Sequence, residues 1–114
     1  TLIDSNRKKA AFLSQSAIEL GLPNVEVACA RVEAFFPASP FDIVIARAYA
    51  ALATFVAQTR HLLVAGGKFF AMKGLRPDDE LARLPPNIRV VAVTRLTVPG
   101  VDAARHLVSL EVAA

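Results

Sequence analysis

A run of four apolar residues, three of them β-branched, occupies positions 43–46 of the chain, between Asp42 and Arg47. Strict alternation of apolar and polar residues is typical of a strand with one exposed face. A continuous run is typical of a strand covered on both faces, as in a parallel sheet between helices. The pattern therefore predicts a buried central strand over residues 41–48. Ligands of such sheets bind just beyond the carboxyl ends of the strands, which is where Arg47 lies.

Apolar spacing along the rest of the chain predicts alternating strands and helices. An apolar stripe indicates a helix that follows Ser5, its expected N-cap, and ends at Gly21; a second helix, over residues 52–63, is expected to end at Gly66-Gly67. Strands are predicted at residues 1–4, 24–29, 68–73, 88–98 and 106–112, a turn or short helical piece at 31–36, and a short helix near 78–80. The turn at residues 99–102 predicts that the last two strands pair as an antiparallel hairpin.

This order of elements predicts an α/β, doubly wound sheet. A terminal hairpin on a parallel sheet narrows the fold to the Rossmann-like arrangement common in class I S-adenosylmethionine-dependent methyltransferases. That step is an analogy between folds, and a fold alone does not determine function. The length of 114 residues predicts one domain over residues 1–114.

Composition and charge restrict the function classes only loosely. Apolar residues make up 54% of the chain, yet no run approaches the roughly 20 residues that span a bilayer, so no membrane association is expected. The single cysteine, Cys29, cannot form an internal disulfide and lies on an apolar strand, which predicts a core position and a cytoplasmic protein. The net charge of +3 permits a polyanionic partner without requiring one. The two histidines and Cys29 have no metal-ligand spacing, so no metal is expected.

Five segments, taken together, resemble the bacterial small-subunit ribosomal RNA methyltransferase G family, also called glucose-inhibited division protein B. These segments are LIDSNRKK at residues 2–9, ARVEAF at 30–35, IARA at 45–48, AMKG at 71–74 and VPGVDAARHLV at 98–108. Each segment alone is a weak signal, but five in the same order are specific. The resemblance implies methyl transfer from S-adenosyl-L-methionine to guanine N7 in 16S ribosomal RNA.

One feature of the family is missing from this sequence. Family members carry a glycine-rich strand-to-helix turn upstream of the strand that ends at Asp4, where the methionine part of the cofactor lies. The chain opens directly on the end of that strand, at Thr1. We therefore expect the protein to start well before residue 1, the first strand of the sheet to be absent from this chain, and the 114 residues to be inactive alone.

The resemblance implies four cofactor-binding residues: Asp4, Val32, Glu33 and Arg47. An acid at the end of a strand in nucleotide-binding α/β folds accepts hydrogen bonds from ribose hydroxyls, although Asp4 could instead cap the following helix. Val32 and Glu33 match positions at the adenosine end of the cofactor, and the alternative for Glu33 is a solvated acid. Arg47 could bind the methionine carboxylate, shape the guanine pocket, or pair with a carboxylate that holds the next loop.

Four cations are candidates for binding the RNA backbone: Lys8, Lys9, Lys73 and Arg105. Lys8 and Lys9 lie in the predicted first turn of a helix, where positive charge opposes the helix dipole, so a use outside the helix is plausible. A solvated surface is the alternative for each of the four. The expected partner is 16S ribosomal RNA or the small ribosomal subunit, and the complete protein is expected to be a monomer. Tyr49 is a minor candidate for stacking on a base.

No catalytic residue is assigned, because guanine N7 has a free lone pair and no proton to remove. The enzyme need only align the reactants and exclude water. Two rival interpretations remain. One is a dinucleotide-binding oxidoreductase domain, which the closing hairpin disfavours. The other is a nucleotide- or RNA-binding Rossmann-like module without catalysis.

Overall fold

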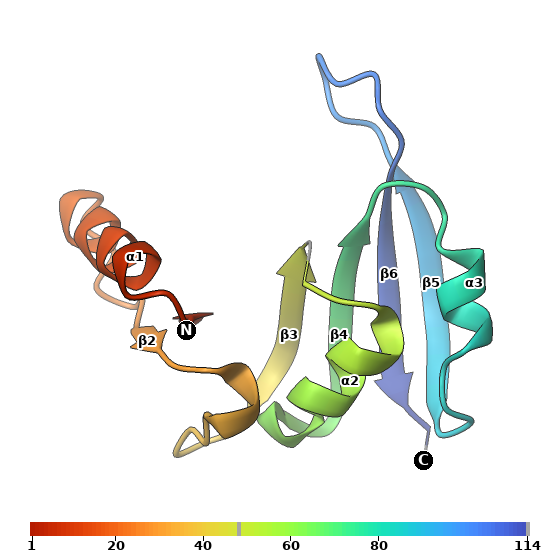
Figure 1. Cartoon of the computed structure of the whole chain (residues 1–114), viewed down its shortest axis with the longest axis horizontal. Coiled ribbons are helices and arrows are strands. Elements are labelled where there is room, and N and C mark those ends of the chain that lie inside the picture. The colour runs from red at the N-terminus through yellow and green to blue at the C-terminus, as the bar shows by residue number, and fades with distance from the viewer. Residues whose placement is uncertain (48, 114) are drawn as a thin grey trace. The chain divides into compact units, whose positions relative to one another are not determined.

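The computed structural model describes residues 1–47 and 49–113 of the chain. These residues form two compact units, Thr1–Phe36 and Pro37–Ala114, and each unit is described by itself (Figure 1). The order of elements is the predicted one: strands and helices alternate up to a closing pair of strands. The α/β prediction is therefore confirmed.

The first unit is a strand-helix-strand segment. Strand β1 (Leu2–Asp4) pairs in parallel with β2 (Val27–Cys29), and helix α1 (Arg7–Glu19) connects them. Asn6, and not the predicted Ser5, is the N-cap of α1: its side chain accepts a hydrogen bond from the Lys9 backbone N–H at 3.0 Å. The chain reverses after the helix at Gly21, whose φ of 64° lies in the left-handed region that favours glycine.

Two predictions for this unit are wrong in detail. The second strand is shorter than predicted and begins at Val27. Cys29 is exposed and not part of the core. It is the last residue of β2, where the sheet ends, and its thiol reaches the Ser5 carbonyl oxygen at 3.8 Å. The apolar character of a strand thus did not predict burial at its final residue.

The second unit contains a four-stranded mixed sheet. Its strands are β3 (Phe41–Arg47), β4 (Leu63–Lys73), β5 (Ile88–Leu96) and β6 (Arg105–Val112), and its helices are α2 (Leu52–Thr59), the 3-10 turn η2 (Arg60–Leu62) and α3 (Asp78–Ala82). The strand order is β3-β4-β6-β5. Strands β3 and β4 are parallel, whereas β6 is antiparallel to both β4 and β5, so the predicted closing hairpin is confirmed.

The core of this unit lies between α2 and one face of the sheet, with α2 in front of the strands in Figure 1. Leu52, Phe55 and Val56 of α2 pack with apolar residues of β4 and β6, and Leu81 of α3 packs against the same cluster. Complete burial of a side chain of this size contributes about 1.5–3 kcal/mol. Burial of this one face therefore orders the sheet and fixes the carboxyl ends of β3 and β4.

Strand β3 is covered on one face only within the second unit, which corrects the prediction of burial on both faces. Val44 and Ala46 face the core, whereas Ile43 and Ile45 are 56% and 63% exposed. β3 is also the edge strand of this sheet. The continuous apolar run correctly predicted a strand. Within this unit, however, other elements cover only every second residue of the run, Val44 and Ala46.

Gly66-Gly67 does not end a helix, as predicted, but lies inside β4. Gly66 adopts a φ of 82°, and the register between β3 and β4 shifts there, so that residue 42 faces residues 64–67. A Cβ atom on Gly67 would lie 3.0 Å from the Asp42 carbonyl oxygen. Close approach of two strands, and not helix termination, therefore accounts for glycine at position 67.

None of the helices in the described part of the chain has the length and apolar character needed to cross a membrane.

Candidate functional site

A pocket of about 490 Å³ lies at the carboxyl ends of β3 and β4 in the second unit. Its walls are Arg47, Tyr49, Ala50, Met72, Lys73, Gly74 and Arg105. The two parallel strands end side by side, with Arg47 opposite Met72, and antiparallel β6 starts at the same edge, with His106 opposite Lys73. The volume is typical of sites for small molecules, which span about 300–1,000 Å³.

The topology brings three of the predicted site residues, Arg47, Lys73 and Arg105, into this one pocket. Among the residues that the structure describes, no acidic residue lines this pocket. Arg47 is exposed and, in the part of the chain that the structure describes, no ion pair involves Arg47 or Arg105. The Arg105 Nη1 donates a hydrogen bond to the Ala104 carbonyl oxygen at 2.9 Å, which leaves its positive charge uncompensated. The pocket therefore favours an anionic ligand.

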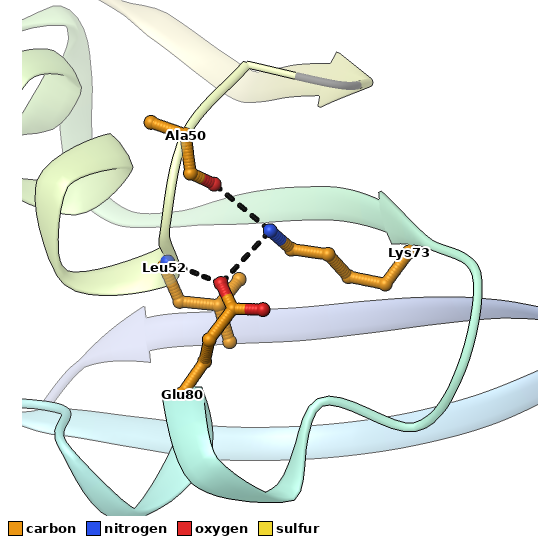
Figure 2. A network of polar contacts seen from close by, with 4 residues as sticks. All are labelled: Ala50, Leu52, Lys73 and Glu80. Atoms are coloured by element: carbon orange, nitrogen blue, oxygen red, sulfur yellow. Dashed lines mark hydrogen bonds and ion pairs between the residues drawn. The ribbon is translucent and has the colours of Figure 1, made fainter.

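Lys73 differs from the two arginines because its ammonium group is held by protein groups. The Nζ atom donates hydrogen bonds to the Ala50 carbonyl oxygen at 2.8 Å and to Glu80 Oε1 at 2.9 Å. Figure 2 shows Lys73 between Ala50 and Glu80, and the same Glu80 oxygen accepts the Leu52 backbone N–H at 3.0 Å. The loop-holding ion pair that the sequence offered as an alternative for Arg47 is thus made by Lys73.

Two further contacts shape the pocket walls. His106 Nδ1 lies 2.8 Å from the Gly74 carbonyl oxygen and holds the turn after β4, in agreement with a structural role for this histidine. The Tyr49 ring packs edge-on against Phe55 of α2, with 5.9 Å between ring centroids, and its hydroxyl is hydrogen-bonded to Gln58. The Tyr49 side chain therefore packs against α2 and also lines the pocket.

In the first unit, Asp4 lies at the carboxyl end of β1, beside the segment that follows β2. Its carbonyl oxygen accepts the Ala30 N–H at 3.2 Å, and its Oδ1 accepts the Asn6 N–H at 2.8 Å. The carboxylate therefore supports the turn before α1, but the helix cap itself is Asn6. An acid at this strand end, close to a neighbouring parallel strand, fits the recognition of a ribose.

Val32 and Glu33 lie on the 3-10 turn η1 (Val32–Ala34), which follows β2. The Val32 side chain is half-buried, as suits contact with a flat apolar ring. Glu33 is exposed and forms a 3.6 Å ion pair with Arg31, a surface pair of the kind that contributes little stability. Asp4 and the Val32–Glu33 segment thus lie at and just after the ends of two adjacent parallel strands.

Lys8 and Lys9 are exposed in the first turn of α1, and no acidic residue accompanies them there. The unfavourable placement of positive charge at the helix start is therefore present in the structure as the sequence predicted. No group of three or more potential metal ligands occurs among the residues that the structure describes.

Glu80 is the residue of this region that sequence reasoning missed, since the sequence predicts only a short helix near residues 78–80 and no contact of Glu80 with α2. The available signal was the absence of a capping residue before α2. Its N-cap is Ala51, and it has no acid in its first turn. An uncapped helix start needs an acceptor from elsewhere in the chain.

A sequence model of the family described as GidB, rRNA small subunit methyltransferase G, matches residues 1–108. The chain is 56% identical over 110 residues to the ribosomal RNA small subunit methyltransferase G of Laribacter hongkongensis, covering 96% of this chain and 53% of that protein. The protein of the same name from Neisseria gonorrhoeae is 54% identical over 110 residues, with the same shares of the two chains. The chain therefore spans about half the length of these relatives.

Solved structures with the same fold include TrmN from Thermus thermophilus, with a TM-score of 0.74 and 21% identity over 96% of this chain and 35% of that one. An rRNA methylase from Streptococcus thermophilus gives a TM-score of 0.65 at 16% identity, covering 98% of this chain and 72% of that one. At these identities the likeness establishes the fold alone. It is the Rossmann-like fold expected from the order of elements.

Proposed function

Because the chain belongs to the rRNA small subunit methyltransferase G family, we propose that the complete protein transfers a methyl group from S-adenosyl-L-methionine to guanine N7 in 16S ribosomal RNA. The observation that carries this proposal is 56% identity, over nearly the whole chain, to a relative with that name. The cationic pocket at the ends of β3 and β4 supports it, since both the RNA and the carboxylate of the methyl donor are anionic.

S-adenosylmethionine supplies an activated methyl group when it is bound. We assign its adenosine end to the first unit, with Asp4 accepting hydrogen bonds from the ribose and with Val32 and Glu33 beside the adenine. In the second unit, Arg47 either binds the methionine carboxylate or shapes the guanine site. A planar guanidinium with several N–H donors suits both tasks.

Guanine N7 presents a lone pair, so the protein has no proton to abstract there. The work of the side chains is to orient the base and to exclude water from it. Tyr49, which lines the pocket, offers an aromatic ring on which a base can stack. We therefore assign no residue of this chain as an acid or a base.

The RNA backbone is the proposed ligand of Lys8, Lys9 and Arg105. Arg105 contributes an uncompensated guanidinium at the pocket, and the two lysines are exposed at the start of α1. Lys73 was a fourth candidate for the same role. Its contacts are considered in the next subsection.

The wider proposals concern the complete protein. Its partner is 16S ribosomal RNA, free or within the small subunit, and it works in the cytoplasm as a monomer. Residues 1–114 are proposed to belong to one methyltransferase domain.

The test is methylation of small-subunit RNA by the complete protein, with S-adenosylmethionine carrying a labelled methyl group. Free 16S RNA and isolated small subunits serve as separate substrates. Borohydride and aniline cleavage then locates N7-methylguanine. Label at a guanine N7 is the expected result. Binding of cofactor and RNA without methyl transfer would contradict the proposal and would favour a non-catalytic binding module.

A further inference from the structure

Helix α2 begins without a capping residue of its own. Its N-cap is Ala51, which offers no side-chain acceptor, and its first turn contains no acid. The first backbone N–H groups of a helix have no partner inside the helix. Here Glu80 Oε1, from α3, accepts the Leu52 N–H at 3.0 Å and places a carboxylate at the positive end of the α2 dipole. A residue distant in sequence thus caps α2.

Lys73 binds the same carboxylate oxygen and also the segment just before the helix. Its Nζ lies 2.9 Å from Glu80 Oε1 and 2.8 Å from the Ala50 carbonyl oxygen (Figure 2). The side chains of Lys73 and Glu80 are 19% and 31% exposed. Partial burial and a shared acceptor make this contact more restrictive than a surface ion pair, in which two mobile side chains meet in water.

The segment held in this way is a wall of the pocket. Tyr49 and Ala50 both line it, and Tyr49 packs edge-on against Phe55, a buried residue of α2. A change in the start of α2 is therefore expected to move the tyrosine ring relative to the rest of the pocket. Misplacement of a reactant by about 1 Å can reduce a rate about a hundredfold.

We infer that Lys73 and Glu80 are positioning residues that fix the Tyr49–Ala50 wall of the pocket, and that Lys73 acts through this wall and not as a ligand of the RNA backbone. This role rests on the proposed methyl transfer. Two of the three N–H donors of the ammonium are already used by Ala50 and Glu80. Lys8 and Lys9, in contrast, are exposed.

The experiment compares Lys73→Met, Lys73→Arg, Glu80→Ala and the double variant Lys73→Met/Glu80→Ala in the complete protein. Lys68→Met is the matched control, because Lys68 lies on the same strand and pairs with Glu111 outside the pocket lining. The measurements are kcat and KM for methylation, the salt dependence of RNA binding, and amide hydrogen exchange over residues 50–57.

We expect Lys73→Met and Glu80→Ala each to lower kcat at least tenfold, with the affinity for RNA and its salt slope unchanged within twofold. The double variant should be no slower than the slower single variant, because each single change already removes the same Lys73–Glu80 contact. Lys73→Arg should recover part of the rate. Exchange at the start of α2 should accelerate at least tenfold in both single variants and stay unchanged in Lys68→Met.

In a protein that methylates RNA, either of two results would overturn the inference. If Lys73→Met reduces the salt slope by about one and Glu80→Ala does not, Lys73 binds a phosphate. If both variants melt at lower temperature with kcat unchanged, the pair is only structural. If the unsubstituted protein does not methylate RNA, the proposed function has failed, and hydrogen exchange alone decides the positioning: equal acceleration supports it and unchanged exchange excludes it.

Discussion

At the scale of single residues, Arg47 ends the strand whose apolar run dominates the sequence, and it is exposed. Arg47 and Arg105 both lack an ion pair in the described residues, but Arg105 is half-buried and donates a hydrogen bond to the Ala104 carbonyl oxygen. Lys73, by comparison, is held by Ala50 and Glu80. Arg47 is therefore the pocket cation most available to a ligand.

We predict that Arg47→Ala in the complete protein weakens cofactor binding or lowers turnover at least tenfold, which corresponds to about 1.4 kcal/mol, while the fold survives. The reason is the loss of the exposed bidentate donor at the end of β3. Calorimetry with S-adenosylmethionine and steady-state methylation measure the two effects. Arg60→Ala, outside the pocket lining, is the control. Normal affinity together with a normal rate would remove Arg47 from the site.

Lys8 and Lys9 lead to a prediction about RNA. Changing both to Ala should weaken RNA binding and flatten its salt dependence by roughly one unit per lost phosphate contact. Affinity for S-adenosylmethionine should stay the same. Filter binding or fluorescence anisotropy at several salt concentrations gives the slope, with Arg83→Ala as the control. An unchanged slope would assign both lysines to a solvated helix face.

At the scale of the elements, the contact between β3 and β4 depends on glycine. Gly67→Ala would place a Cβ atom 3.0 Å from the Asp42 carbonyl oxygen and 3.1 Å from the Val64 carbonyl oxygen. Backbone atoms cannot move aside as the end of a side chain can, so we expect a loss of about 1–3 kcal/mol in the free energy of unfolding.

Gly74→Ala is the matched control for this prediction, since the nearest atom to its Cβ would be 3.8 Å away. Urea denaturation of the complete protein measures both changes. Equal stability of the two variants would show that the strands separate at Gly67 without cost, and that the close approach is not what requires glycine there.

At the scale of the whole molecule, the exposed face of β3 leads to a prediction about the stability of residues 1–114 in isolation. Ile43 and Ile45 are exposed, and β3 is the edge strand of its sheet. Exposed apolar edges promote association with other chains. The matched relatives are about twice as long as this chain. A larger protein is therefore expected to bury this face.

We predict that residues 1–114 alone unfold at a lower temperature than the complete protein and are not stabilised by S-adenosylmethionine. The complete protein should gain about 2.7 kcal/mol at a cofactor concentration one hundred times Kd. Thermal denaturation of both, with and without cofactor, gives the comparison. Cooperative unfolding of the 114 residues at a temperature that rises with cofactor would contradict the prediction.

Local sequence patterns were sufficient to predict the order of the elements and the parallel and antiparallel parts of the sheet. These features follow from local periodicity and from the rule that parallel strands present their carboxyl ends at one edge. Arg47 was predicted from its place at a strand end, whereas Lys73 and Arg105 were candidates as cations near the cofactor face that the family resemblance implies.

The partners of these side chains depend on tertiary packing and could not be predicted from the sequence. Gly66-Gly67 was predicted to end a helix because glycine is favoured both at helix ends and at strand irregularities, where the backbone adopts a positive φ. The local sequence does not distinguish these two cases. The hydrogen bonds of Lys73 to Ala50 and of Glu80 to Leu52 join residues 23 and 28 positions apart. Periodicity acts over a few residues, whereas an uncapped helix start and a half-buried ammonium find partners through the packing of whole elements.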